Sequence, residues 1–249
     1  MGLSLRKHTE PLLPSCASPA SSVGLGRHRV PDYLTRYWWA YVRPQAVWFW
    51  ERQWLVNLVL LGNYGKLATA ALDELGRHLP GRTLQIACCY GNFTPQLARN
   101  IEESGGTLDV VDILPLQLQN LRRKLWQGAP VRTQQLDSTA MEFADATFDR
   151  VVLFFLLHEQ PQEAREQTVR EALRVLKPGG TILILDYAPP AKWHPARYLL
   201  LPILALIEPF AADLWRSELS EVLPKQFAGR TWQKTSYFGG LYQRLVSRG

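Results

Sequence analysis

This sequence has no apolar run long enough to cross a membrane and no two cysteines spaced as a CxxC motif. The richest apolar run, at residues 198–210, is interrupted by Pro202, Glu208 and Pro209. It falls short of the ~18 consecutive apolar residues that a membrane-spanning helix needs. The chain has three cysteines in 249 residues, two of them adjacent, and no CxxC pair. Because adjacent cysteines form a disulfide only with strain, the composition predicts a reduced, intracellular protein.

The sequence also lacks the motifs of a nucleic-acid-binding protein, although its charge is positive. The formal net charge of +6 and the pI near 9.3 would suit an anionic partner, either nucleic acid or an acidic membrane surface. There is no RNA-binding aromatic motif, no zinc-finger spacing and no long basic run. We therefore expect no nucleic-acid partner, and a basic surface that is either simply solvated or faces anionic lipid. The sequence predicts no particular oligomeric state.

Residues 1–30 lack a hydrophobic period. They mix serine, proline, glycine and basic residues, a composition typical of a disordered tail. Glu10 is their one acidic residue, which would also suit a targeting peptide, but the prolines oppose an amphipathic helix. The prediction is a disordered tail, with a targeting peptide as the alternative.

Residues 31–79 are dense in aromatic residues and predict helices. Pro44 should break the segment, and Gly62 and Gly65 should mark a further bend. Five of the nine tryptophans lie here, at positions 38, 39, 48, 50 and 54. They fall on several helix faces, so a single buried stripe cannot cover all of them. The excess favours a surface that meets a ligand, a partner or a bilayer interface.

From residue 80 the pattern alternates between apolar strands and helices. The predicted strands are "RTLQIA", "TLDVVDI", "VRTQQLD", "FDRVVLFFLL" and "GGTILILDY". The predicted helices are Pro95–Glu103, Pro115–Trp126 and Gln162–Leu176. Such alternation predicts a parallel sheet that is covered on both faces. Residues 231–248 predict two further strands, joined as a hairpin at Gly239-Gly240.

Two segments carry a family resemblance. "REALRVLKPGGTILILDYAPP" (170–190) and "LDSTAMEFADATFDRVV" (136–152) resemble the S-adenosylmethionine (SAM) methyltransferases of ubiquinone and menaquinone synthesis. The resemblance covers residues 80–249 and implies the class I SAM methyltransferase fold, a doubly wound, Rossmann-like α/β sheet of seven strands with a terminal antiparallel hairpin. The expected organisation is a tail at 1–30, a helical lid at 31–79 and a SAM-binding domain at 80–249.

A narrower resemblance covers residues 31–216. "YWWAYVRPQAVWFWERQW", "ACCYGNFTP", "VVDILPLQLQNLRRKL" and "FFLLHEQP" are similar to the RquA family of rhodoquinone biosynthesis. This resemblance implies that ubiquinone is the substrate, that an amino group from SAM replaces a ring methoxy group, and that manganese supports the reaction. It also implies a cytoplasmic protein at the membrane surface, or one in the mitochondrial matrix if the source is eukaryotic. The alternatives are a SAM-dependent methyltransferase of a quinone or other lipid, and a non-catalytic SAM-fold subunit of a quinone-synthesis complex.

The turn after the first strand departs from the pattern of the SAM fold. An acid usually closes that strand and binds the methionine amino group, and glycines then let the backbone approach the nucleoside. Here Gln85 occupies the position of the acid. Ala87 and Cys89 occupy the positions of the first two glycines, and Gly91 occupies that of the third. Tyr90 adds a bulky side chain to the turn. The resemblance assigns all five to the cofactor. An uncharged Gln85 predicts that the methionine end is held by another group, unless the turn has simply degenerated.

Carboxylates close the next two strands. Asp112, followed by Ile113, ends the second strand, where it can accept hydrogen bonds from both ribose hydroxyls. Asp137, followed by Ser138, ends the third strand, and the resemblance implies that it accepts the adenine amino group. The alternatives are a turn aspartate for Asp112 and a helix cap for Asp137.

The catalytic candidates are His158, Glu159 and Tyr64. His158 and Glu159 follow the fourth strand at the carboxyl edge of the sheet, where they could act as general acid and base or bind metal. Tyr64 and Tyr41 could close the lid over SAM. Packing is the alternative role for all four residues.

No metal-ligand spacing is visible in the sequence. Asp186, at the end of the fifth strand, and His194 could complete an oxygen and nitrogen ligand set, but nothing in their spacing requires it. The metal ligands are therefore left unassigned.

Overall fold

The computed structural model describes residues 31, 44–88, 90–199 and 210–249. Two predicted cofactor residues, Tyr41 and Cys89, lie outside these ranges, as do the predicted tail and most of the apolar run at 198–210. None of the helices within the described ranges is both long and apolar enough to cross a bilayer.

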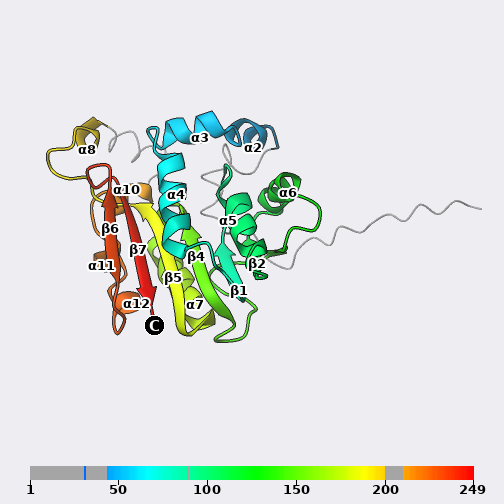
Figure 1. Cartoon of the computed structure of the whole chain (residues 1–249). Helices are drawn as coiled ribbons and strands as arrows, with labels where there is room; N and C mark the ends of the chain where they lie inside the picture. Colours follow the sequence, from blue (N-terminus) through cyan, green and yellow to red (C-terminus); the bar gives the residue numbers. More distant parts are fainter. Residues whose placement is uncertain (1–30, 32–43, 89, 200–209) are drawn as a thin grey trace, which may run out of the picture.

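A seven-stranded mixed sheet forms the centre of the molecule, in the order β3-β2-β1-β4-β5-β7-β6 (Figure 1). The strands are β1 (Arg82–Ile86), β2 (Thr107–Asp112), β3 (Val131–Gln135), β4 (Phe148–Phe154), β5 (Leu176–Tyr187), β6 (Gln233–Tyr237) and β7 (Tyr242–Arg248). Strands β1 to β5 pair in parallel, and β7 pairs antiparallel with β5 and β6. This confirms the predicted α/β sheet and its terminal hairpin.

Helices cover both faces of the sheet, with α4 on one face and α7 on the other (Figure 1). The principal helices are α4 (Tyr64–Leu75), α5 (Phe93–Glu102), α6 (Pro115–Lys124) and α7 (Gln162–Val175). Short helices α8 (Ala196–Leu199), α10 (Ala211–Leu214), α11 (Leu219–Val222) and α12 (Pro224–Phe227) follow β5. Helix α5 begins at Phe93, before the predicted start at Pro95, because a proline fits the first turn of a helix, where no backbone donor is needed.

The described part of the segment before the sheet is helical, as its sequence predicted. It forms α2 (Pro44–Trp50), α3 (Gln53–Val59) and α4, with Pro44 at the start of α2. Gly62 has a φ of +78° and lies between α3 and α4, which confirms one predicted bend. Gly65 is the second residue of α4, so the bend ends just before it. Helices α2 and α3 lie across the carboxyl ends of the parallel strands (Figure 1).

The fourth strand is shorter than predicted, and its end shapes the site. Strand β4 ends at Phe154, and Phe155 has a φ of +54°, in the left-handed region. Leu157–Glu159 then form the short 3-10 helix η2. The apolar run "LFFLL" therefore does not continue as a strand, because its last residues turn across the carboxyl edge of the sheet.

Candidate functional site

Two neighbouring strands end in residues with left-handed backbone conformations. Ala87 (φ +63°) follows β1, and Phe155 (φ +54°) follows β4. Strand order reverses between β1 and β4, and ligands of open α/β sheets bind in the crevice at such a switch point. Strained non-glycine residues also concentrate at functional sites. The paired strand ends therefore indicate where a ligand binds.

The turn after β1 keeps the conformation of a glycine turn without the glycine. Ala87 takes the first glycine's place with a positive φ, and its N–H donates to the Val111 carbonyl at 2.8 Å. The buried Gln85 side chain donates from Nε2 to the Ala87 carbonyl at 3.0 Å. Gln85 thus supports the backbone of the turn with a neutral amide at the position where the fold usually has an acid.

Asp112 connects the end of β2 to this turn. Its Oδ2 accepts hydrogen bonds from the Cys88 N–H at 3.0 Å and from the Cys88 thiol at 3.3 Å, and its Oδ1 accepts from the Leu114 N–H at 2.9 Å. Burial raises the pKa of the Asp112 carboxyl, and the hydrogen bonds from Leu114 and Cys88 oppose that shift. A carboxylate has about four acceptor positions, so Asp112 retains capacity for a ribose hydroxyl.

The second half of the turn is held by Tyr64 from α4. The Tyr64 hydroxyl accepts a hydrogen bond from the Phe93 N–H at 2.9 Å and donates to the Tyr90 carbonyl at 3.3 Å. A Cβ atom at Gly91, where φ is +85°, would lie 2.5 Å from that hydroxyl, so only glycine fits. The Tyr90 hydroxyl accepts from Gln117 Nε2 at 2.9 Å, and burial raises the pKa of Tyr90.

Asp137 has the local contacts of a turn cap. Its Oδ1 accepts hydrogen bonds from the Thr139 N–H at 2.8 Å and from the Thr139 hydroxyl at 2.7 Å. The neighbouring Ser138 hydroxyl lies 2.8 Å from the Thr168 hydroxyl, and the Ile113 carbonyl accepts from Gln135 Nε2 at 3.2 Å. The adenine contact of Asp137 thus stays a prediction alongside a capping role that the geometry displays.

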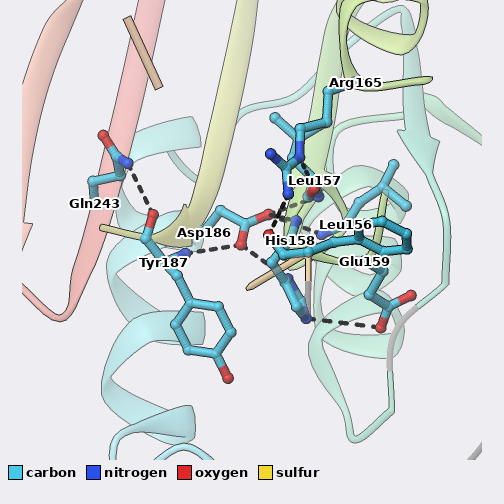
Figure 2. A network of polar contacts seen from close by, with 9 residues as sticks. Leu156, Leu157, His158, Glu159, Arg165, Asp186, Tyr187 and Gln243 are labelled. Atoms are coloured by element: carbon cyan, nitrogen blue, oxygen red, sulfur yellow. Dashed lines mark hydrogen bonds and ion pairs between the residues drawn. The ribbon is translucent and has the colours of Figure 1, made fainter. Parts of the chain in front are cut away.

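Asp186 and His158 form a buried pair at the ends of β5 and β4 (Figure 2). Asp186 Oδ1 lies 2.9 Å from His158 Nδ1 and also accepts from the Tyr187 N–H at 2.8 Å. Asp186 Oδ2 accepts from the N–H groups of Leu156 at 3.1 Å and Leu157 at 2.7 Å. A carboxylate that accepts these hydrogen bonds leaves Nδ1 of His158 as the donor.

The other ring nitrogen of His158 faces Glu159. Nε2 of His158 lies 3.8 Å from Oε1 of Glu159 (Figure 2). Because Nδ1 donates to Asp186, Nε2 is the nitrogen that can take up or release a proton. Aromatic rings surround this imidazole, with the ring centroids of Tyr187 at 4.8 Å and Phe155 at 6.0 Å. His158 therefore lies between two carboxylates and against two aromatic rings.

No cluster of three or more histidine, cysteine, aspartate or glutamate residues within the described ranges could hold a metal ion. Asp186, which the sequence offered as a metal ligand, instead accepts hydrogen bonds from the backbone and from His158. The described residues therefore do not fit the expected manganese site.

The structure brings half of the ten predicted cofactor residues together. Gln85, Ala87, Tyr90, Gly91 and Asp112 form one connected set around the turn. Two contacts of the candidate site were missed from the sequence, that of the Glu51 carboxylate with the Gly91 N–H and that of the Asp186 carboxylate with His158. In the sequence, the one available sign of the contact between Asp186 and His158 was the position of Asp186 at the end of a strand.

Comparison with known proteins gives the same fold. Residues 83–180 match a family model described as a methyltransferase domain. The structure of N-methyltransferase NodS from Bradyrhizobium japonicum matches with a TM-score of 0.55 and 14% identity, covering 78% of this chain and 97% of that one. The structure of 1,6-didemethyltoxoflavin-N1-methyltransferase from Burkholderia thailandensis matches with a TM-score of 0.53 and 18% identity, covering 86% and 85%.

Similar sequences come from quinone biosynthesis. The ubiquinone/menaquinone biosynthesis C-methyltransferase UbiE of Azotobacter vinelandii is 35% identical over 141 residues, which cover 55% of this chain and 54% of that protein. UbiE of Idiomarina loihiensis is 34% identical over 112 residues, covering 44% and 43%. The chain thus spans about half the length of the curated relatives it matches. The chain has the class I SAM methyltransferase fold, and part of it is similar in sequence to a methyltransferase domain and to the ubiquinone/menaquinone C-methyltransferases.

Proposed function

We propose that this protein is a SAM-dependent enzyme that acts on a membrane quinone, and that it forms rhodoquinone from ubiquinone. In this reaction the amino nitrogen of SAM bonds to a ring carbon of the quinone, and the methoxy group on that carbon takes up a proton and leaves as methanol. The bond from the nitrogen to the α-carbon of SAM then breaks by elimination, with loss of a proton from the β-carbon, so that no oxidant is needed. Two observations support the substrate class: the relatives in quinone biosynthesis and the aromatic rings around His158. The sequence resemblance to the RquA family supports amino transfer rather than methyl transfer.

The observation that carries amino transfer is the neutral Gln85 in place of an acid. A carboxylate there would attract the ammonium form of the SAM amino group, and an ammonium has no lone pair with which to attack a ring. Gln85 instead donates its amide to the Ala87 carbonyl. In the proposal, this loss of negative charge lets the amine reach its neutral, nucleophilic form.

His158 is the proposed proton acceptor. Nδ1 donates to Asp186, so Nε2 is the ring nitrogen proposed to take up the proton, and Glu159 lies beside it to stabilise an imidazolium. Tyr64 has a supporting role in this proposal, because its hydroxyl is engaged with the Phe93 N–H and the Tyr90 carbonyl. Asp112 and Asp137 would hold the ribose and the adenine. The described residues offer no ligand set for manganese, so no step is assigned to a metal.

The helical segment at 31–79 is proposed as a lid that meets the membrane. Its described part exposes six large apolar side chains, together termed the aromatic face: Trp48, Phe49, Trp54, Leu58, Val59 and Leu61. Trp48 is 65% exposed and Trp54 is 58% exposed, and the Arg52 guanidinium lies 4.1 Å from the Trp48 ring centroid. Tryptophans flanked by cations suit the interface of an anionic bilayer, in which a quinone would be dissolved.

Methyl transfer to a quinone precursor is the second candidate function. It is favoured by the relatives, which are named as C-methyltransferases. Both reactions need SAM in the same turn, so the product and not the cofactor separates them. A non-catalytic subunit would give neither product.

The test incubates the purified full chain with SAM that carries heavy nitrogen in its amino group and heavy carbon in its methyl group. Ubiquinone, or a precursor that lacks the ring methyl group, is supplied in vesicles with and without manganese. Amino transfer predicts a quinone that has lost a methoxy group and gained heavy nitrogen, as identified by mass. Heavy carbon on the precursor without heavy nitrogen on ubiquinone would replace this proposal with methyl transfer. Absence of both products would support the non-catalytic alternative.

A further inference from the structure

Glu51 lies outside the cofactor motif, yet its carboxylate contacts the cofactor turn. It stands between α2 and α3. Its Oε1 accepts a hydrogen bond from the Gly91 N–H at 3.2 Å and from Lys124 Nζ at 2.8 Å. Its Oε2 accepts from Asn120 Nδ2 at 2.6 Å. One side chain of the N-terminal segment therefore joins the turn after β1 to helix α6.

Lys124 completes a clamp around Gly91. Its Nζ donates to the Gly91 carbonyl at 2.8 Å, while the Gly91 N–H donates to Glu51. Both backbone groups of this one residue are thus bound by the two members of an ion pair. The side chains are only 21% exposed for Glu51 and 20% for Lys124, so water screens the pair less than it screens a surface pair.

Gly91 is the residue of the turn that most needs such support. It has a φ of +85°, and it is the remaining glycine of the usual set. Glycine has the greatest conformational freedom of all residues, so holding it in one conformation has an entropic cost. On its other side, Tyr64 binds the Tyr90 carbonyl and the Phe93 N–H. Residues 90–93 are therefore held by groups from α4, from α6 and from the junction of α2 and α3.

We propose that Glu51 is a positioning residue for the cofactor, supplied by the N-terminal helices. It holds Gly91 and its neighbours in the conformation that SAM binding requires, in a turn that lacks its usual first two glycines. This inference rests on the proposed function only in so far as the chain binds SAM. It adds a cofactor-site residue that no motif of the fold contains.

The test measures the affinity of the full chain for S-adenosylhomocysteine (SAH) by calorimetry in wild type, Glu51→Gln and Lys124→Met. Glu51→Gln should weaken SAH binding about tenfold, the effect of losing one charge-assisted hydrogen bond. Lys124→Met should act in the same direction. Hydrogen exchange at residues 90–93 should become faster in both variants, because each variant loses a contact to the Gly91 backbone, while exchange in the sheet should stay unchanged.

Glu74→Gln is the matched control. Glu74 is 18% exposed and pairs with Arg244, away from the turn. It should lower thermal stability about as much as Glu51→Gln does, and leave SAH affinity within twofold of wild type. The inference is overturned if Glu51→Gln binds SAH like wild type, or if Glu74→Gln weakens binding equally. A wild type that does not bind SAH overturns the proposed function and this inference together.

Discussion

The Asp112 carboxylate accepts a hydrogen bond from the Cys88 N–H at 3.0 Å, and this contact joins the end of β2 to the turn after β1. A residue expected to hold the ribose therefore also shapes the turn that the nucleoside would approach. Loss of its charge should affect both functions. The hydrogen bonds of Asp112 are internal to the protein, so they exist before any ligand arrives and preorganise the site.

Replacing Asp112 tests the ribose contact. Asp112→Asn keeps one acceptor oxygen for the turn but removes the charge, and each charge-assisted hydrogen bond lost is worth roughly 1.5–3 kcal/mol. We expect SAH affinity to fall by at least tenfold while the fold is retained, as measured by calorimetry and circular dichroism. Unchanged affinity in a folded variant would show that Asp112 only supports the turn.

The raised pKa of Asp112 predicts a pH dependence. Burial disfavours the ionised form in the folded state, so the stability from this group is fully present below the unfolded pKa, about 3.9. That stability is lost as pH rises through the higher folded pKa. The unfolding free energy of Asp112→Asn should therefore improve relative to wild type as pH rises above about 4. Urea titrations at several pH values would measure it, and a constant difference would contradict the shift.

Asp186 should control the rate through His158. Asp186→Asn keeps an oxygen for the N–H groups of Leu156 and Leu157 but presents an amide N–H to Nδ1, which disfavours the Nδ1–H form of the imidazole. We expect product formation to fall about a hundredfold, within the usual range for acid–base catalysis. In a His158→Gln background the same change should have little further effect. Additive losses in this double-mutant cycle would mean that Asp186 acts independently of His158.

Asp186→Ala separates stability from rate. This change leaves several buried donors without an acceptor, at about 1–3 kcal/mol for each. We therefore expect a much lower urea midpoint for Asp186→Ala than for Asp186→Asn. Equal midpoints for the two variants would show that the network in Figure 2 contributes little to stability.

Ala87→Gly should stabilise the fold. A left-handed conformation costs an L-residue roughly 1–2 kcal/mol, and glycine recovers this while losing roughly 0.5–1 kcal/mol of chain entropy. We expect a gain of about 0.5–1 kcal/mol in the urea unfolding free energy. Ala70→Gly, inside α4, should instead destabilise by about 1 kcal/mol. Destabilisation by both changes would mean that the Ala87 methyl group makes a packing contact worth more than the strain.

The aromatic face should bind anionic vesicles. Wild type is expected to sediment with them, and salt should release it only in part, because buried aromatic surface is not screened. Trp48→Ser with Trp54→Ser should abolish most binding at high salt. Vesicles of zwitterionic lipid provide the control for charge. Complete release of wild type at moderate salt would show that the protein binds the vesicles by electrostatic attraction alone.

The sequence by itself determined the sheet and most of its helices. Apolar strand runs, helical periods and the Gly239-Gly240 turn are local patterns, and each element follows from residues next to one another. They also placed Asp112 at the end of its strand. The errors lie at element ends, as at Phe155 and at the start of α5, where tertiary contacts decide which residue turns.

Only the tertiary structure decided which side chains meet at the site. Glu51 and Gly91 are 40 positions apart, and His158 and Asp186 are 28 apart. The second pair meets because β4 and β5 align Phe154 with Leu185, which brings their carboxyl ends together. The first pair depends on how α2 and α3 cross the sheet edge, and no local periodicity encodes that angle. Contacts of this kind arise from the packing of whole elements, so residues distant in the sequence determine which groups contact the turn.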